Sequence, residues 1–202
     1  MEAQGSGKRT FLVRAWRAIR WALAALVVAY VVLVIWRIPA VAEQKKSAQL
    51  VEQIQAQRLT LADADGSHLP PPPAPKEVDA TVAGVDANGN GIRDDVELAI
   101  FKLYPNSPYT RAAELQYAMT EQMFLTDVID TATWKAAAEE DGRANLCLIA
   151  LGVGYEKTKS LSDEVEKLVF DTQARQNAKE KAFTFTTSHG DASGKTCDVE
   201  IQ

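Results

Sequence analysis

The sequence predicts a mainly α-helical protein: an N-terminal transmembrane helix, a proline-rich linker and a small helical bundle that ends in a C-terminal β-hairpin. Three observations carry this prediction. An uncharged apolar run lies near the N-terminus, a cluster of prolines begins at residue 70, and apolar residues recur at helical spacing beyond it. The chain has 202 residues, and the part from 79 to 202 is long enough for one small core.

The charge of the chain is divided unevenly. Residues 1–37 carry six Lys or Arg against one Glu, so the formal total of −5 leaves residues 38–202 with −10. Because phosphate recognition needs a basic face, this acidic part argues against nucleic acid as a partner. It also offers no nucleotide site, since Gly190–Thr196 resembles a phosphate-binding loop but has three residues between its glycines where four are needed.

The apolar run predicts a membrane-spanning helix. Residues 21–36 carry no charge, and the span extends to 19–38 if the flanking arginines snorkel toward the lipid headgroups. Twenty helical residues cover about 30 Å, which matches the hydrocarbon core of a bilayer. More basic residues precede the span than follow it, so we expect residues 1–18 to lie in the cytoplasm as a basic N-terminus.

A cleaved signal peptide is the alternative for this segment. Ala40-x-Ala42 fits the small-residue rule for cleavage, which would leave Glu43 as the new N-terminus and release the protein. Both interpretations place the rest of the chain outside the cytoplasm. The anchored form would be a single-pass protein of the cytoplasmic membrane with its C-terminal domain in the periplasm or its equivalent.

Two segments are expected to connect the membrane to the folded domain. Residues 39–61 are polar with a weak apolar stripe, which predicts a helical stalk. Residues 62–78 contain Pro70–Pro73 and Pro75, which favour an extended polyproline II conformation. The sequence therefore predicts that the linker is a spacer between membrane and domain.

The stretch Asp86–Glu97 predicts a calcium site. It matches the pattern D-x-[DN]-x-[DN]-G-x5-E without a gap. Calcium takes six to eight oxygen ligands, so a short loop with alternating Asp and Asn side chains can wrap around it. Gly91 stands where the chain must turn sharply. The pattern points to ion binding rather than to catalysis.

This stretch resembles the calcium loops of the EF-hand superfamily, and most of all the shorter loops of dockerins and thrombospondin type 3 repeats, which share D-x-N-G-[DN]-G-I-x-D-D. The stretch Gly84–Glu97 is also similar to one carried by uncharacterised exported bacterial proteins, G-[VI]-D-x-N-x-N-G-[VI]-R-D-D-V-E. The resemblance covers about a dozen residues. By position it implies Ca²⁺ as the cofactor and the following ligands, with Ile92 contributing its backbone carbonyl: Asp86, Asn88, Asn90, Ile92, Asp94 and Glu97.

The loop departs from the EF-hand pattern in three ways. Residues 79–85 follow prolines and are expected to be extended rather than helical, Arg93 replaces the usual aliphatic eighth residue, and there is no second loop. We therefore expect a lone structural loop with modest affinity, in the range of about 10⁻⁴–10⁻³ M typical of extracellular modules. The alternative is a metal-free turn in which Asp94 caps the following helix and Glu97 completes a capping box.

The remaining chain predicts about four helices and a disulfide. Apolar spacing places helices at 95–103, 109–126, 133–151 and 160–182. Alternation in 183–187 and 197–201 predicts the hairpin, unless the last helix continues through Phe185. The two cysteines, Cys147 and Cys197, are expected to pair in an exported domain.

These features predict a non-enzymatic, membrane-anchored and extracytoplasmic calcium-binding module that serves a structural or interaction role with an envelope protein partner. The main alternative is an envelope enzyme, such as a metal-assisted hydrolase that uses Asp or Glu. A proline-spaced scaffold like the TonB-type energy couplers is a third possibility, and the predicted helical domain fits it poorly. No other motif in the chain indicates catalysis.

Overall fold

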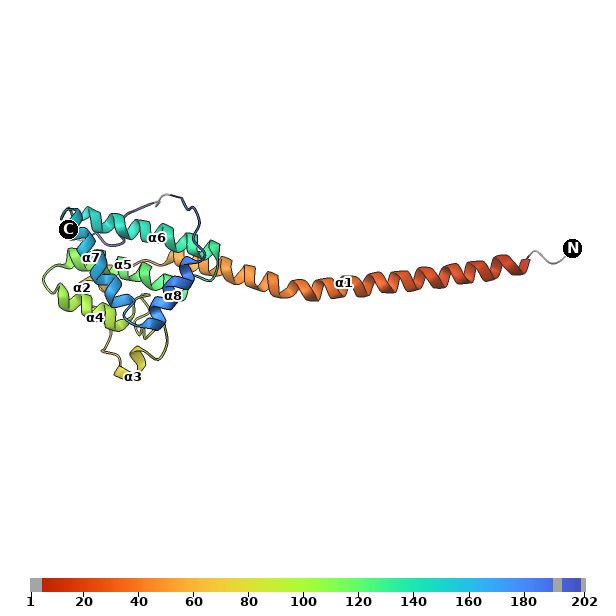
Figure 1. The fold of residues 1–202 in the computed structure, drawn as a ribbon, viewed down its shortest axis with the longest axis horizontal. Coiled ribbons are helices and arrows are strands. Elements are labelled where there is room, and N and C mark those ends of the chain that lie inside the picture. Colours follow the sequence, from red (N-terminus) through yellow and green to blue (C-terminus); the bar gives the residue numbers. More distant parts are fainter. Residues whose placement is uncertain (1–4, 191–193, 201–202) are drawn as a thin grey trace. The chain divides into compact units, whose positions relative to one another are not determined.

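The computed structural model describes residues 5–190 and 194–200. The chain divides into two units, Met1–Lys46 and Ser47–Gln202. Helix α1 (Gly5–Ala56) forms the first unit and contributes its last residues to the second. Seven further helices are described in the second unit (Figure 1): α2 (Leu61–Asp65), α3 (Pro75–Val78), α4 (Asp94–Leu103), α5 (Pro108–Thr126), α6 (Thr131–Ala150), α7 (Tyr155–Val169) and α8 (Gln173–Phe183).

Helix α1 contains the helix predicted at 19–38. Its part from Trp16 onward is long and apolar enough to cross a membrane, and the most apolar window of this part has none of its residues buried in protein. Trp21 and Trp36, at the two ends of the uncharged run, expose 77% and 79% of their surface. A helix with an apolar surface on every side needs lipid or another protein around it.

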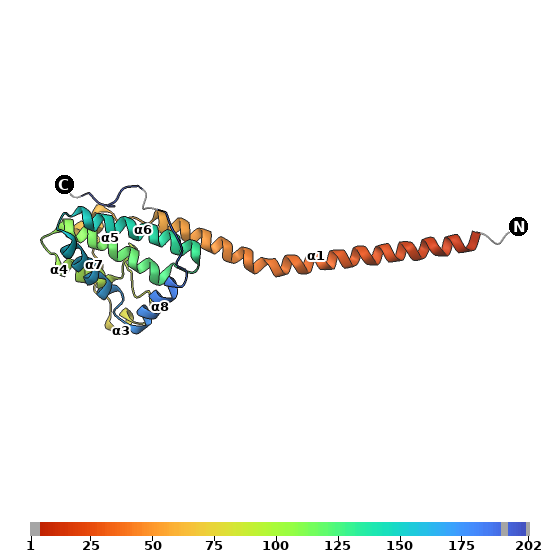
Figure 2. The ribbon, with the colours of Figure 1, turned by 45° about the horizontal axis from the view of Figure 1, so that its top comes forward.

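The second unit is built around α5. Every residue of α5 from Arg111 to Phe124 is buried, and helices α2, α4, α6, α7 and α8 all contact it. Both views show α5 running inside the bundle, beside α6 (Figures 1 and 2). The core contains the apolar residues predicted on α5, namely Ala112, Leu115, Met119 and Met123.

Local sequence signals explain where the helices begin. Pro108 occupies the first turn of α5, where its missing N–H is not needed. The side chain of Asp130 accepts the Thr133 N–H and caps α6. Three acidic residues stand in the first turn of α4, where they interact favourably with the helix dipole. The predicted helices 95–103, 109–126 and 133–151 are all present within two residues of their expected ends.

The single long helix predicted at 160–182 is wrong, because the chain breaks there into α7 and α8. The Arg93 side chain donates to the carbonyl oxygens of Leu168 (2.9 Å) and Val169 (3.3 Å), at the end of α7. The Thr172 hydroxyl then accepts the Arg175 N–H and starts α8.

The predicted β-hairpin is also wrong, since residues 5–190 and 194–200 contain no strand. Helix α8 ends at Phe183 and the next residues form turns. The tail pairs instead with a side chain of α5: Gln116 donates to the Thr196 carbonyl (2.8 Å) and accepts the Asp198 N–H (2.8 Å). Ile201, the last residue of the expected second strand, lies outside the described residues.

The predicted disulfide is confirmed. Cys147 on α6 is bonded to Cys197 in the tail, across a sequence separation of 50 residues. The side chain of Arg143, one turn earlier on α6, donates to the Lys195 carbonyl (2.7 Å) and to Asp198 (2.6 Å). The bond and these contacts fasten the tail to α6.

The end of the predicted stalk and the linker pack on the domain, whereas the sequence predicted a stalk and a spacer that lie outside it. The compact unit begins at Ser47 rather than at residue 79. Ile54 and Leu59 belong to the core cluster, with 0% and 4% of their surface exposed. Two short helices, α2 and α3, lie within the proline-rich region. Apolar burial and the hydrogen bonds from Arg111 to the Ala64 carbonyl therefore hold this segment on the domain.

Candidate calcium-binding loop

The candidate loop lies between α3 and α4, and Asp86 organises its first half. The Asp86 carboxylate accepts the backbone N–H groups of Gly89 (2.8 Å), Asn90 (3.2 Å) and Gly91 (2.9 Å). Gly89 and Gly91 have φ values of 72° and 83°, which favour glycine. Asp86, the first residue of the loop, thus holds the backbone of residues 89–91 in a turn around its own carboxylate.

The two asparagines connect the loop to its surroundings. Asn88 donates through Nδ2 to Oε2 of Glu97 (3.0 Å) and to the backbone carbonyl of His68 (3.0 Å). The Asn90 Oδ1 accepts the Ile92 N–H (2.9 Å). Asn88 therefore joins the loop to α4 on one side and to the linker on the other.

Asp94 and Glu97 lie in the first turn of α4 and are almost fully buried, with 1% and 0% exposure. Asp94 Oδ1 accepts the Ala87 N–H (2.9 Å). The other oxygens, Asp94 Oδ2 and Glu97 Oε1, have no hydrogen-bond partner. Burial raises the pKa of Glu97 to about 7, against the opposing effects of the Asn88 and Asn90 side chains, and burial also raises the pKa of Asp94.

The structure brings some of the predicted ligands together and leaves others apart. Asn88 contacts Glu97 directly, whereas the Asp86 carboxylate is occupied by backbone N–H groups and the Ile92 side chain is buried in the core. Across residues 5–190 and 194–200, no three His, Cys, Asp or Glu side chains gather into a metal-binding cluster. The three carboxylates of the predicted ligand set are therefore not arranged as a closed cage.

The residues nevertheless fit a hard cation. Two buried carboxylate oxygens lack a donor, and burying such a group without a partner is unfavourable. The other side chains of the proposed ligand set are carboxylate or amide groups, without sulfur or imidazole. An all-oxygen set suits calcium, whereas zinc prefers cysteine and histidine.

Arg93, the departure at the eighth loop position, points away from the loop. Its side chain is 1% exposed and pairs with Asp95 (2.6 Å) and Asp171 (2.9 Å), besides the two carbonyls at the end of α7. Arg175, also 1% exposed, pairs with the same Asp171 and donates to the backbone carbonyls of Val78 and Val82. Residues 79–83, which form turns and bends rather than the expected extended segment, are held to the α7–α8 turn through this network.

Sequence reasoning missed two neighbours of the loop, Gln57 and His68. Gln57 donates from Nε2 to the Asn90 carbonyl (3.2 Å), and both Gln53 and Gln57 line a hollow of about 250 Å³ with Asp86, Gly91 and Gln122. Since 33 residues separate Gln57 from Asn90, no local pattern signals this contact.

No family model, curated protein or solved structure matches the chain.

Proposed function

We propose that the protein is a non-enzymatic, membrane-anchored module outside the cytoplasm, in which the loop Asp86–Glu97 binds calcium and stabilises the entry to the helical domain. The observation that carries the proposal is the pair of buried, unpartnered oxygens on Asp94 and Glu97 at the end of a loop with calcium-loop spacing. A divalent cation would offset the unfavourable burial of both carboxylates.

The chain's own residues would divide the work as follows. Asp86 shapes the turn by accepting three N–H groups, which leaves one lone pair of its Oδ2 for an ion. Asp94 and Glu97 present their free oxygens from a rigid helix turn. The side-chain oxygens of Asn88 and Asn90 and the Ile92 carbonyl are the neutral ligands that the spacing assigns.

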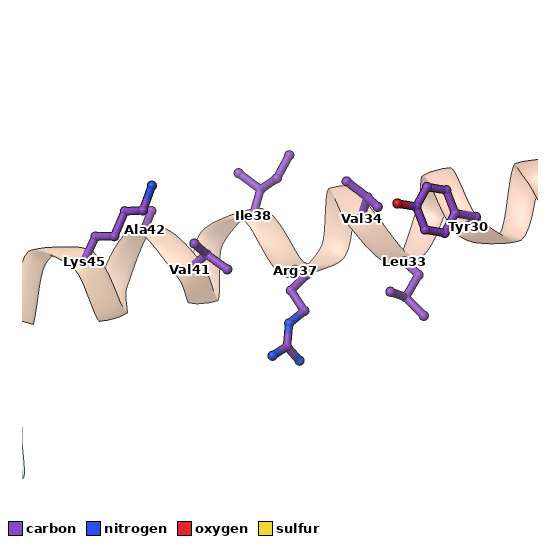
Figure 3. Close-up of a pocket in the computed structure, with 8 residues that line it drawn as sticks. All are labelled: Tyr30, Leu33, Val34, Arg37, Ile38, Val41, Ala42 and Lys45. Carbon is purple, nitrogen blue, oxygen red and sulfur yellow. The ribbon is translucent and has the colours of Figure 1, made fainter.

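The membrane part of the proposal rests on α1. Residues 19–38 would span the bilayer with the basic N-terminus inside and the domain outside. Figure 3 shows Arg37 and Lys45 extending from different sides of the helix, beside Ile38 and Val41. Such side chains suit the boundary between hydrocarbon and headgroups, where their charges can reach water.

An envelope protein is the proposed partner of the domain. Exposed apolar side chains surround the connection between α6 and α7, where Ile149, Val153 and Tyr155 expose 59%, 46% and 77% of their surface. Neighbouring apolar residues of this kind mark interaction sites more often than isolated ones do. This surface supports an interaction role.

Calcium titration of the full chain in non-ionic detergent micelles tests the function. We expect heat of binding with a Kd of about 10⁻⁴–10⁻³ M and a rise in melting temperature at millimolar calcium. Glu97→Gln should abolish both effects, because it removes a charged ligand and retains the acceptor for Asn88. Glu180→Gln, on an exposed carboxylate of α8, is the control. If wild-type protein releases no heat and its melting temperature stays unchanged, the calcium proposal fails.

A further inference from the structure

The end of helix α1 contacts the candidate loop at a single side chain. Gln57 directly follows Ala56, the last residue of α1, and its N–H still bonds to the Gln53 carbonyl (3.0 Å). Its side-chain amide donates to the backbone carbonyl of Asn90 (3.2 Å). The loop therefore receives a hydrogen bond from the last residues of the predicted stalk, directly after the end of α1.

The shape of the loop at Gly91 matches this contact. Gly91 has φ +83°, and any side-chain carbon at this position would collide with the Gln57 amide. The peptide on which Gln57 rests thus lies at the sharp turn that the ion-binding pattern requires. Gln57 fills the space that the glycine leaves open.

The rest of the segment is held independently of the loop. Ile54 and Leu59 are buried in the core, Arg58 pairs with Glu140 (3.0 Å), and the Leu59 N–H bonds to Asp198 (3.1 Å). A change in the loop would therefore alter the local docking of Gln57 without detaching the whole segment. This limits the expected effect to residues close to Gln57.

We infer that calcium binding and the docking of the α1 end are coupled, and that Gln57 is the positioning residue that couples them. The inference rests on the proposed calcium function. An ion held by Asn90 and its neighbours fixes the Asn90 carbonyl and the Gly91 turn, so it strengthens the hydrogen bond from Gln57 to that carbonyl. By thermodynamic linkage, Gln57 strengthens calcium binding by the same factor. Calcium would thereby regulate how firmly the end of α1 is fastened to the domain.

The test compares Gln57→Ala with Gln53→Ala in the full chain in micelles. Gln53 lines the same hollow one turn earlier, and its side chain makes no hydrogen bond to the loop among the described contacts. Calcium affinity is measured by calorimetry, and amide hydrogen exchange of peptides covering residues 50–60 is followed with and without calcium. We expect Gln57→Ala to raise the calcium Kd about threefold to tenfold, the effect of one lost hydrogen bond, and Gln53→Ala to change it less than twofold.

Calcium should also slow exchange around Gln57 in wild type and in Gln53→Ala, and do so less in Gln57→Ala. Melting temperatures without calcium show whether either variant is simply unfolded. Absence of calcium binding by wild type would refute the proposed function itself. If wild type binds calcium but the two variants match each other in Kd and exchange, the coupling is overturned while the calcium function stands.

Discussion

The Arg93 side chain replaces the aliphatic residue that EF-hand loops use to pair with a sister loop. Here the guanidinium leaves the loop, holds the last carbonyls of α7 and pairs with Asp95 and Asp171. Arg93, which departs from the EF-hand pattern, thus connects the loop to the end of α7. These contacts give Arg93 a role in the fold of the domain.

We predict that Arg93→Met destabilises the full chain by about 3 kcal/mol, because it leaves Asp171 and two buried carbonyls with fewer donors while preserving the apolar stem. Urea unfolding in detergent, followed by circular dichroism, measures the change. Lys135→Met, on an exposed side chain of α6, should stay within about 0.5 kcal/mol of wild type. Equal stability of the two variants would contradict this connection between the loop and α7.

The Glu114 side chain is an unusual feature of the central helix. It is fully buried, and neither carboxylate oxygen has a hydrogen-bond partner. Burial raises the pKa of Glu114 from 4.5 to about 8 against the opposing effect of the Tyr104 hydroxyl, and the Glu164 carboxylate raises it further, partly opposed by Lys157. The raised pKa favours the protonated form of Glu114 in the folded protein at neutral pH.

This raised pKa predicts that stability falls with increasing pH. A carboxyl group whose folded pKa exceeds its unfolded value stabilises the fold fully below pH 4.5, and this contribution is lost as pH rises through about 8. Glu114→Gln should match wild type within about 1 kcal/mol at pH 4 and be about 2 kcal/mol more stable at pH 9. Urea unfolding at both pH values, with Glu180→Gln as the control, checks the crossover. A pH-independent difference would show that Glu114 titrates normally.

At the scale of elements, the last turns of α1 belong to the domain. Ile54 lies in the same apolar cluster as Val96 and Met119 and is fully buried. We predict that Ile54→Ala costs about 2–5 kcal/mol of unfolding free energy, the usual range for such a cavity. Gln55→Ala, on the exposed face of the same turn, should have almost no effect. If Ile54→Ala also leaves the free energy of unfolding unchanged, residues 47–61 form a free stalk.

The helices were predictable where the signal is local. Apolar spacing and Pro108 define α5, and the acidic first turn defines the start of α4. The break between α7 and α8 was not predictable, because it depends on Arg93, which lies about 75 residues earlier. The alternation in the tail predicted a strand, yet Gln116 of α5 takes the backbone groups that a partner strand would have used.

The candidate loop likewise contains some contacts that could be predicted from local sequence and others that could not. The turn made by Asp86 and its glycines follows from neighbouring residues and was visible in the sequence. The contacts of Gln57 and of the His68 carbonyl join segments 33 and 20 residues apart, so only the folded chain reveals them. The burial of Glu97 likewise depends on the packing of the whole domain.

At the scale of the whole molecule, we predict that the chain keeps its N-terminal helix. Residues 19–38 should resist extraction from membranes by alkaline carbonate, because about 20 apolar residues insert stably into a bilayer. Mass spectrometry of the membrane fraction should give the intact mass of 22.1 kDa. A protein that begins at Glu43 and appears in the soluble fraction would establish cleavage after Ala42 instead.

The disulfide has a consequence for the order in which this protein matures. Cys197 is the sixth residue from the end of the chain, and its partner Cys147 lies 50 residues earlier. With the proposed topology Cys147 is synthesised and crosses the membrane before Cys197 does. Under that topology the bond cannot close until Cys197 has been synthesised and has crossed the membrane, so its formation follows the export of helices α5 to α8.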